Sequence, residues 1–313
     1  IEKYFKVPHA RKDVVMGPGD DCALLTLPPD AQLAVSTDTL VSGVHFFPDM
    51  DPVDLGYKAL AVNLSDLAAM GAEPRWVSLA LTLPAINERW VAGFAEGFLE
   101  LAEYYNVALV GGDMTRGPLS ITVSVKGSVP AGRALMRSGA KAGDGVYVTG
   151  TLGDAALALS HLLGKRTLNE NQLAAVLPRL DHPHPRILAG QALRGLASSA
   201  LDLSDGLASD LGHILKASGV RAQIDLNLLP LSPVLQDAVP AMDAWQLALA
   251  GGDDYELCFT VPQEHHGALD TALANCGVKF TRIGRILAGE PGIDYLQDEQ
   301  PVELHLKGWD HFA

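Results

Sequence analysis

Apolar residues recur at helical spacing over residues 57–74, where the sequence reads YKALAVNLSDLAAMGAEP. Because apolar side chains occupy most of its circumference, the segment is predicted to be a helix that is buried on nearly all sides. Asp51 and Pro52 are suited to be its N-cap and its first helical residue, and Gly71 is suited to end it. The pattern therefore predicts a central helix that begins at Pro52 and ends near Gly71.

Three polar residues, Asn63, Ser65 and Asp66, interrupt the apolar surface of this helix. A carboxylate in such surroundings costs several kcal/mol unless it is paired or bound to a cation. Asp66 is therefore either a capped or salt-bridged core residue or a metal ligand. The second alternative requires further carboxylates elsewhere in the chain that lack cationic partners.

Alternating and continuous apolar runs predict strands on both sides of this helix and a second helix after it. In the first half we expect strands at residues 33–39, 76–83, 107–117 and 121–129, and a helix at 88–105 capped by Asn87. The strand in 107–117 is expected to run into a glycine turn that exposes Asp113. In the second half a hinge at 133–144 precedes a strand from 146, three or four helices within 155–197, a strand and helix at 200–211, and strands at 222–226 and 255–261. This order predicts an α/β (α+β) protein with two domains, residues 1–135 and 136–313.

Acidic residues gather at glycine-rich turns and strand ends in both halves. These acids are Asp20, Asp21, Asp38, Asp113, Asp202, Asp205, Asp253 and Asp254. Any one of them is more readily explained as a turn former or a helix cap. That explanation weakens for the whole set, because the glycine turns share one form and few basic residues lie nearby in the sequence. Two unit charges ~4 Å apart repel by about 4 kcal/mol at an effective dielectric near 20, so converging acids would need cations between them.

Ligands that are all oxygen suit Mg²⁺ or Ca²⁺ and not zinc. Magnesium usually bridges a few carboxylates to substrate phosphates, so the acids predict a nucleotide site. The chain nevertheless has no GxxxxGK[ST] loop, no GxGxxG turn, no GxSxG elbow and no HExxH helix. His182 and His184 are better explained by a proline-rich turn than by a metal site. His45 follows the strand that carries Asp38, and it either contacts a substrate phosphate or packs locally.

The formal net charge is −14, and 48% of the 313 residues are hydrophobic. Sizeable cores are therefore easy to bury, whereas nucleic-acid binding is disfavoured because no basic stripe interrupts the acidic surface. No apolar run reaches the ~18 residues of a membrane span, and no signal-peptide pattern is present. The three cysteines lack metal-ligand spacing, and their odd number argues against a disulfide framework. We expect a cytoplasmic protein without a membrane or nucleic-acid partner.

The acidic turns, in this order, resemble those of the thiamine-monophosphate kinases, in the superfamily of aminoimidazole ribonucleotide synthetase and selenophosphate synthetase. The resemblance covers almost the whole chain. The matching strings are GDDCA, STDTLVSGVHF, YKALAVNLSDLAAMGAEP, GGDMTRGP, RSGAKAGD, VTGTLGD, LDLSDGLASDL, GGDDYEL and KGWDHF. One departure is that many relatives carry glutamate where this chain has Asp253.

The resemblance implies a two-domain α/β fold whose N-terminal domains, each a mixed sheet with two long helices, pair in a homodimer. It also implies ATP-dependent phosphorylation of thiamine monophosphate, with several Mg²⁺ ions and catalytic roles for Asp66, Asp205 and Arg137. The implied metal ligands are Asp21, Ser36, Thr37, Asp38, Asp66, Asp113, Asp202 and Asp205. The implied ATP contacts are Gly112, Asp113, Arg137 and Ser204. The implied contacts to thiamine phosphate are His45, Asp253 and Trp309, and the Trp309 ring suits a flat cation; the alternative for Trp309 is packing into the second domain.

Two other classes of function are compatible with parts of the pattern: another enzyme of the superfamily and a non-catalytic module that binds cations. A selenophosphate synthetase would carry a reactive cysteine in an N-terminal glycine-rich segment, where Cys22 is a poor substitute, and a hydrogenase-maturation relative would end in a cysteine-bearing tail. A non-catalytic module that binds Ca²⁺ or Mg²⁺ would leave His45 and Arg137 without a role.

Overall fold

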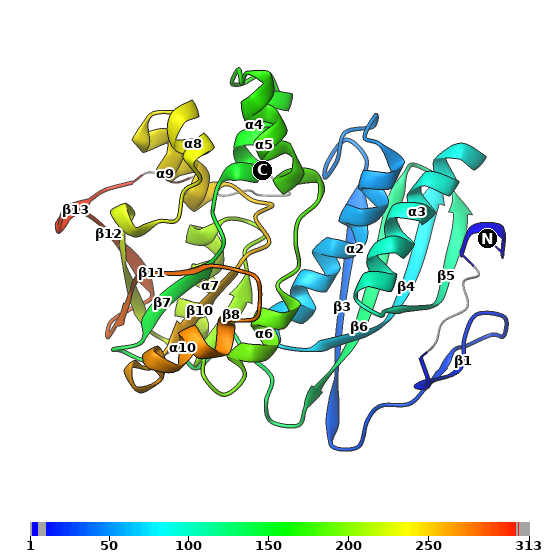
Figure 1. Cartoon of the computed structure of the whole chain (residues 1–313), viewed down its shortest axis with the longest axis horizontal. Helices are drawn as coiled ribbons and strands as arrows, with labels where there is room; N and C mark the ends of the chain where they lie inside the picture. Colours follow the sequence, from blue (N-terminus) through cyan, green and yellow to red (C-terminus); the bar gives the residue numbers. More distant parts are fainter. Residues whose placement is uncertain (1, 6–10, 305, 307–313) are drawn as a thin grey trace. The chain divides into compact units, whose positions relative to one another are not determined.

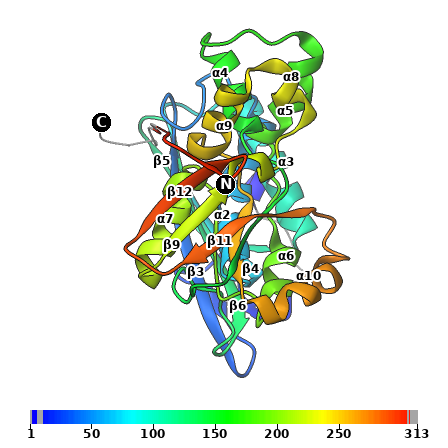
Figure 2. The same ribbon diagram turned by 90° about the vertical axis from the view of Figure 1, so that its left-hand side faces the viewer.

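The computed structural model describes residues 2–5, 11–304 and 306. The chain divides into two compact units (Figures 1 and 2). The first contains residues 1–67 and 72–134, and the second contains residues 68–71 and 135–313. No helix in the described part of the chain combines the length and the apolar character that a membrane crossing would need.

The first unit is built on a four-stranded mixed sheet with the strand order β3-β6-β4-β5. The parallel pair is β4 with β5, and the other neighbours are antiparallel. Two long helices, α2 and α3, cover one face of this sheet (Figure 1). The bounds are β3 Ala31–Val41, α2 Pro52–Ala69, β4 Glu73–Leu83, α3 Glu88–Tyr104, β5 Ala108–Arg116 and β6 Ser120–Pro130.

Both long helices begin as their sequences predict. The side chain of Asp51 accepts a hydrogen bond from the N–H of Val53 at 2.8 Å, and Pro52 is the first residue of α2. Asn87 caps α3 by accepting from two backbone N–H groups. Gly71 follows the end of α2 with φ of +64°, a left-handed conformation that a glycine adopts without strain.

Helices α2 and α3 approach each other closely because each contributes a glycine to the contact. A Cβ atom placed on Gly97 would lie 1.9 Å from the carbonyl oxygen of Val53, and one on Gly56 would lie 2.1 Å from that of Phe94. Neither position can hold a side chain without separating the helices. The pair of glycines therefore sets how tightly this layer packs over the sheet.

A short hairpin of β1 (Val14–Met16) and β2 (Leu24–Leu25) and a helical turn, α1 (Glu2–Phe5), complete the first unit. The apolar side of the hairpin packs against Trp76, Ala108 and Val110. Leu25 and Leu27 are among the side chains that make this contact. Residues 17–23 form the loop of this hairpin, and the hairpin itself is packed against the sheet.

The second unit contains a seven-stranded sheet in the order β13-β12-β9-β11-β7-β10-β8. Its strands are β7 Gly145–Thr149, β8 Ser199–Asp202, β9 Arg221–Asp225, β10 Leu257–Val261, β11 Phe280–Leu287, β12 Gly292–Gln297 and β13 Gln300–Val302. Its helices are α4 Asp154–Leu162, α5 Glu170–Asp181, α6 Ile187–Leu193, α7 Leu207–Ser218, α8 Pro233–Ala238, α9 Ala241–Ala250 and α10 His266–Leu273. Of these helices, α4, α5 and α6 lie in the stretch where the sequence predicts three or four, and α5 and α6 are separated by the proline-rich turn.

Candidate functional site

Side chains that could ligate a metal through oxygen extend from β3 and from α2 and meet between the sheet of the first unit and α2. Ser36 and Asp38 lie two residues apart on β3 and so project toward the same face, the one that α2 covers. The hydroxyl of Ser36 donates to Asp66 Oδ2 at 2.5 Å. Burial and the negative charge of Asp66 raise the pKa of Asp38 to about 6. Two carboxyl groups and a hydroxyl from distant segments therefore form one acidic cluster.

Asn63 supports this cluster from one turn earlier on α2. Its Oδ1 accepts the backbone N–H of Asp38 at 3.1 Å, and its Nδ2 donates to the carbonyl oxygen of Ala59 at 3.0 Å. Both ends of the buried amide are thus satisfied, which fixes the register of β3 against α2. The sequence singles out Asn63 as polar but not as the residue that aligns Asp38.

The face of the sheet away from α2 and α3 carries two other candidate residues. Thr37 lies between Ser36 and Asp38, so the alternation of the strand directs it to this exposed face. The cross-strand register places Asp113 there as well, opposite Ala80 on β4. The prediction that Asp113 lies on a glycine turn is wrong, because β5 continues through it to Arg116.

The glycines before Asp113 have a packing role. A Cβ on Gly112 would lie 1.9 Å from the carbonyl oxygen of Leu79, whereas one on Gly111 would meet nothing within 4 Å. Gly112 therefore allows β5 to approach β4 closely at the position just before Asp113.

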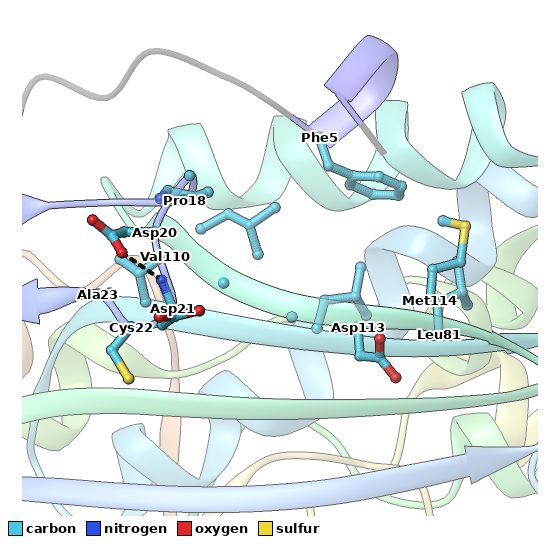
Figure 3. Close-up of a pocket in the computed structure, with 15 residues that line it drawn as sticks. Phe5, Pro18, Asp20, Asp21, Cys22, Ala23, Leu81, Val110, Asp113 and Met114 are labelled. Carbon is cyan, nitrogen blue, oxygen red and sulfur yellow. Dashed lines mark hydrogen bonds between the residues drawn. The ribbon is translucent and has the colours of Figure 1, made fainter.

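A pocket of about 220 Å³ lies between the hairpin loop and β5. Asp20, Asp21 and Cys22 line it from the loop, Gly112 and Asp113 line it from β5, and apolar side chains that include Phe5, Val110 and Met114 complete it. Figure 3 shows the carboxylates of Asp21 and Asp113 on the side of the pocket away from Phe5. Two of the predicted metal ligands thus share one pocket.

The hairpin that bears this loop is fastened by a partly buried ionic contact that the sequence does not indicate. Asp13 accepts from Arg11 at 2.6 and 2.9 Å, from Arg75 at 2.6 Å and from the Trp76 indole N–H at 3.3 Å. Hydrogen bonds from Arg11, followed by those from Arg75, lower the pKa of Asp13 to about 2. Asp13 thereby ties the start of the hairpin to β4.

His45 lies in the loop that follows β3. Its Nδ1 accepts the backbone N–H of Val41 at 3.0 Å. In the neutral ring the proton is therefore on Nε2, which can donate to an anionic group.

In the second unit, two of the predicted motifs lie side by side. The N–H of Asp253 donates to the carbonyl oxygen of Ser204 at 2.9 Å, and the N–H of Tyr255 donates to that of Leu203 at 2.8 Å. Asp205 follows directly, and its own N–H donates to Asp210 Oδ2 at 3.0 Å. Burial raises the pKa of Asp210 to about 7. The turn after β8 and the turn before β10 therefore form one structural element.

The remaining candidates of the second unit differ in their surroundings. Asp202 is buried at the end of β8. Asp254 is also buried, and both of its oxygens accept the N–H of Gly153 at 3.0 Å, so it serves the loop before α4. Arg137 is exposed after the first unit ends. Trp309 lies outside the described residues.

The acidic candidates are thus distributed over three places: the pocket with Asp21 and Asp113, the cluster of Ser36, Asp38 and Asp66, and the paired turns with Asp202 and Asp253. Within the described ranges, no three His, Cys, Asp or Glu side chains converge closely enough to hold a metal ion by themselves. Oxygen ligands from a substrate or water must therefore complete any metal sphere that these residues form.

Comparison with known proteins relates both units to one family. Residues 19–129 match the N-terminal domain of AIR synthase related proteins, and residues 141–295 match the C-terminal domain. A thiamine-monophosphate kinase of Escherichia coli K12 is 56% identical, and the alignment covers 100% of this chain and 97% of the relative. The thiamine-monophosphate kinase of Haemophilus influenzae is 46% identical, with 100% and 96% covered.

Solved structures agree with these matches. The crystal structure of thiamine-monophosphate kinase from Stenotrophomonas maltophilia K279a has a TM-score of 0.87 and 45% identity, and covers 94% of this chain and 93% of its own. The structure of AaThiL complexed with AMPPCP and TMP has a TM-score of 0.79 and 33% identity, and covers 99% and 94%. The hydrogenase maturation protein HypE, at 21% identity and a TM-score of 0.77, shares the fold over 98% of this chain and 92% of its own. These findings confirm the family resemblance and the fold class that the sequence predicts.

Proposed function

Because the chain belongs to the thiamine-monophosphate kinase family of AIR synthase related proteins, we propose that it transfers the γ-phosphoryl group of ATP to thiamine monophosphate. The product is thiamine diphosphate. The observation that supports this activity most directly is the identity of 56% over the whole chain with a thiamine-monophosphate kinase. The relative that binds AMPPCP and TMP, at 33% identity, supports both substrates.

The donor set of the first unit fits magnesium. Ser36, Asp38 and Asp66 offer a hydroxyl and two carboxylates at one place, and the raised pKa of Asp38 indicates that a second negative charge is costly there without a cation. We assign several Mg²⁺ ions to the predicted ligands. Ser36, Asp38 and Asp66 are assigned where they cluster, Asp21 and Asp113 at the pocket of the first unit, and Thr37, Asp202 and Asp205 as further ligands. When bound, Mg²⁺ would neutralise charge on the phosphate groups and help to align them.

The reaction needs no general base. The acceptor is a phosphate monoester whose second pKa is near 6, so its oxygen is largely ionised at neutral pH. Phosphoryl transfer then depends on positioning and on compensation of charge, and it proceeds in line without a phosphoenzyme. We assign charge compensation to the guanidinium of Arg137, and the placement of reacting phosphates to Asp66 and Asp205.

The substrate contacts are assigned to the residues that the family resemblance implies. Gly112 and Asp113, at the pocket of the first unit, and Arg137 and Ser204 are assigned to ATP. His45 is assigned to the phosphate of thiamine monophosphate, because Nε2 bears the proton when Nδ1 accepts from Val41. Asp253 and Trp309 are assigned to the thiamine moiety.

The proposal includes a homodimer formed by the first units and a cytoplasmic location, where ATP is available. The uncovered face of the sheet supports the dimer, because Leu33 is 49% exposed and Val35 is 57% exposed on it. Light scattering should give twice the mass of the chain, and Val35→Glu should shift it toward the monomer. A wild-type mass equal to one chain would contradict the dimer.

The deciding assay measures ADP release from ATP with thiamine monophosphate, aminoimidazole precursors or selenide as acceptor. We expect ADP and thiamine diphosphate in equal amounts with thiamine monophosphate alone, and no ADP after EDTA treatment. Magnesium binding without any ADP release would instead favour a non-catalytic module. Release with another acceptor would favour a different enzyme of the superfamily.

A further inference from the structure

A buried glutamate, Glu256, joins four segments of the second unit just before β10. Its carboxylate accepts from the hydroxyl of Thr149 at 2.6 Å, from Arg179 Nη2 at 2.6 Å, and from Arg186 Nε and Nη2 at 2.6 and 2.5 Å. These partners lie at the end of β7, near the end of α5 and immediately before α6. We call Thr149, Arg179, Arg186 and Glu256 the Glu256 cluster.

The neighbouring backbone is shaped to admit this carboxylate. Gly150 has φ of +61°, and a Cβ atom placed on it would lie 2.1 Å from Glu256 Oε1. Only a glycine leaves room there for the carboxylate to reach the hydroxyl of Thr149. The approach of Glu256 to the end of β7 is therefore built into the local sequence VTG.

Stability alone does not explain the Glu256 cluster. Replacement of a buried ion pair by apolar residues is often neutral or stabilising, because the charges must be desolvated. Here two guanidinium groups share one carboxylate, and Arg179 Nε is buried without a hydrogen-bond partner. Although burial opposes it, the hydrogen bonds and charges of Arg186 and Arg179 keep the pKa of Glu256 low, so the carboxylate stays ionised.

The segment directly before Glu256 has a constrained backbone. Asp253 and Tyr255 have φ of +68° and +48°, in the left-handed region that costs a non-glycine residue ~1 kcal/mol or more. Between them, Asp254 is held through both oxygens by the N–H of Gly153. Such a conformation persists only where surrounding contacts fix it, and the Glu256 cluster is the contact at its C-terminal end.

The same segment holds the turn after β8. The N–H groups of Asp253 and Tyr255 donate to Ser204 and Leu203, and the carbonyl oxygen of Glu256 accepts the N–H of Leu203 at 2.8 Å. The main chain of Glu256 thus binds this turn while its side chain binds α5 and α6. The hydroxyl of Tyr255 additionally donates to Asp253 Oδ1 at 3.2 Å.

We propose that Glu256 is a positioning residue: through its contacts with Arg179, Arg186 and Thr149 it fixes the left-handed segment that presents Asp253 and, through the paired turn, Ser204. The inference rests on the proposed function insofar as Asp253 and Ser204 contact the substrates. The conformational part stands on the contacts of Glu256 alone. It assigns a role in the substrate site to a residue whose side chain points into the interior.

The first test compares wild type with Glu256→Gln. Hydrogen exchange measured by NMR or by mass spectrometry should show the amides of Asp253 and Tyr255 exchanging about tenfold faster or more in the variant, because removal of one partner from a buried ionic cluster is strongly destabilising. Calorimetry should show a comparable loss of affinity for thiamine monophosphate in the presence of AMPPCP and magnesium, at a temperature at which both proteins are folded. If exchange and affinity both stay within twofold of wild type, the inference is wrong.

A second variant separates positioning from stability. Glu256→Gln combined with Arg186→Met removes one cation together with the anion, so the net charge of the cluster equals that of wild type. We expect this double variant to recover most of the thermal stability that Glu256→Gln loses, but not the slow exchange or the affinity. Full recovery of all three would overturn the inference, because charge balance would then be the whole effect. If Glu256→Gln does not fold, Arg186→Lys, which keeps the charge but loses the paired contact, takes its place.

The matched control is Asp294→Asn. It breaks the ion pair with Arg221, whose two contacts of 2.6 and 2.7 Å join β9 to β12 in the same sheet. Exchange at Asp253 and affinity for thiamine monophosphate should stay at wild-type values in this control; equal losses in the control would refute a specific role for Glu256. If wild type itself fails to bind thiamine monophosphate, the proposed function fails, while the exchange data still decide whether Glu256 holds the segment.

Discussion

Replacement of Asp66 by asparagine should lower activity and raise the stability of the metal-free protein at the same time. Asparagine has the shape of aspartate and can still accept the Ser36 hydrogen bond, which is 2.5 Å long in the structure. It removes the charge that, together with burial, raises the pKa of Asp38 to about 6. Replacement of a residue that is needed only for folding would lower both the activity and the stability of the protein. A loss of activity together with a gain of stability therefore identifies a metal ligand.

The size of the stability gain follows from the pKa of Asp38. A rise from 3.8 to about 6 corresponds to about 3 kcal/mol of unfavourable ionisation. Burial is the larger cause, and Asp38 is partly exposed to screening solvent, so the share of Asp66 is about 0.5–1 kcal/mol. Because the folded-state pKa lies above the unfolded one, this cost is absent below pH ~4 and complete above the folded pKa.

Urea unfolding in EDTA at pH 8 measures the effect, with Glu96→Gln on the exposed side of α3 as the control. The Asp66→Asn variant should unfold at a higher midpoint than wild type, and the difference should shrink as the pH falls from 8 to 4. Magnesium at 100 times its dissociation constant should stabilise wild type by about 2.7 kcal/mol and the variant by much less. Turnover near the wild-type rate, or a metal-free variant that is less stable than wild type, would refute the ligand assignment.

Three further changes test separate parts of the structure. Gly112→Ala should destabilise the first unit by about 1–3 kcal/mol in thermal unfolding, because its Cβ would lie 1.9 Å from the Leu79 carbonyl oxygen, whereas Gly111→Ala, with open space, should be near neutral. Asp13→Asn should lower the free energy of unfolding by about 1–2 kcal/mol at pH 7. Because the pKa of Asp13 is lowered to about 2, this difference from wild type should narrow as the pH falls below 4, and a difference that does not depend on pH would contradict the ionic contact. Trp309→Ala should raise the KM for thiamine monophosphate in steady-state kinetics, and an effect confined to ATP would remove Trp309 from the acceptor site.

Local signals account for the parts of the fold that the sequence predicts. The cap at Asp51, the proline after it and the glycine at residue 71 delimit α2 because each acts within one helical turn. Strand β3 is predicted at residues 33–39 and is observed at Ala31–Val41, where Val35, Thr37, Thr39 and Val41 are β-branched. By contrast, no signal of comparable strength marks β12, whose six residues are all half-buried, or α8, which has only six residues.

The role of a glycine is hard to predict from sequence, because a glycine can either form a turn or allow two backbone segments to approach closely. Gly111 and Gly112 look like a turn in the sequence, but β5 runs through them and Gly112 allows close contact with β4. The sequence does not predict the ionic contacts of Glu256, because Arg179 and Arg186 precede it by 77 and 70 residues. Nothing local relates such residues, and only the folded chain brings their charges together.

The order of strands in the first sheet has a consequence for how the chain folds. Strand β6 is the last of the four in the sequence, yet it lies between β3 and β4. During synthesis β3 therefore has no neighbour within this sheet until β6 begins at Ser120, about 80 residues after β3 ends at Val41. Pairings of such long sequence separation form slowly. A nascent chain that stops before β6 should expose β3 as an unpaired edge. The acidic cluster of Ser36, Asp38 and Asp66 can therefore assemble only after the whole N-terminal unit has been made.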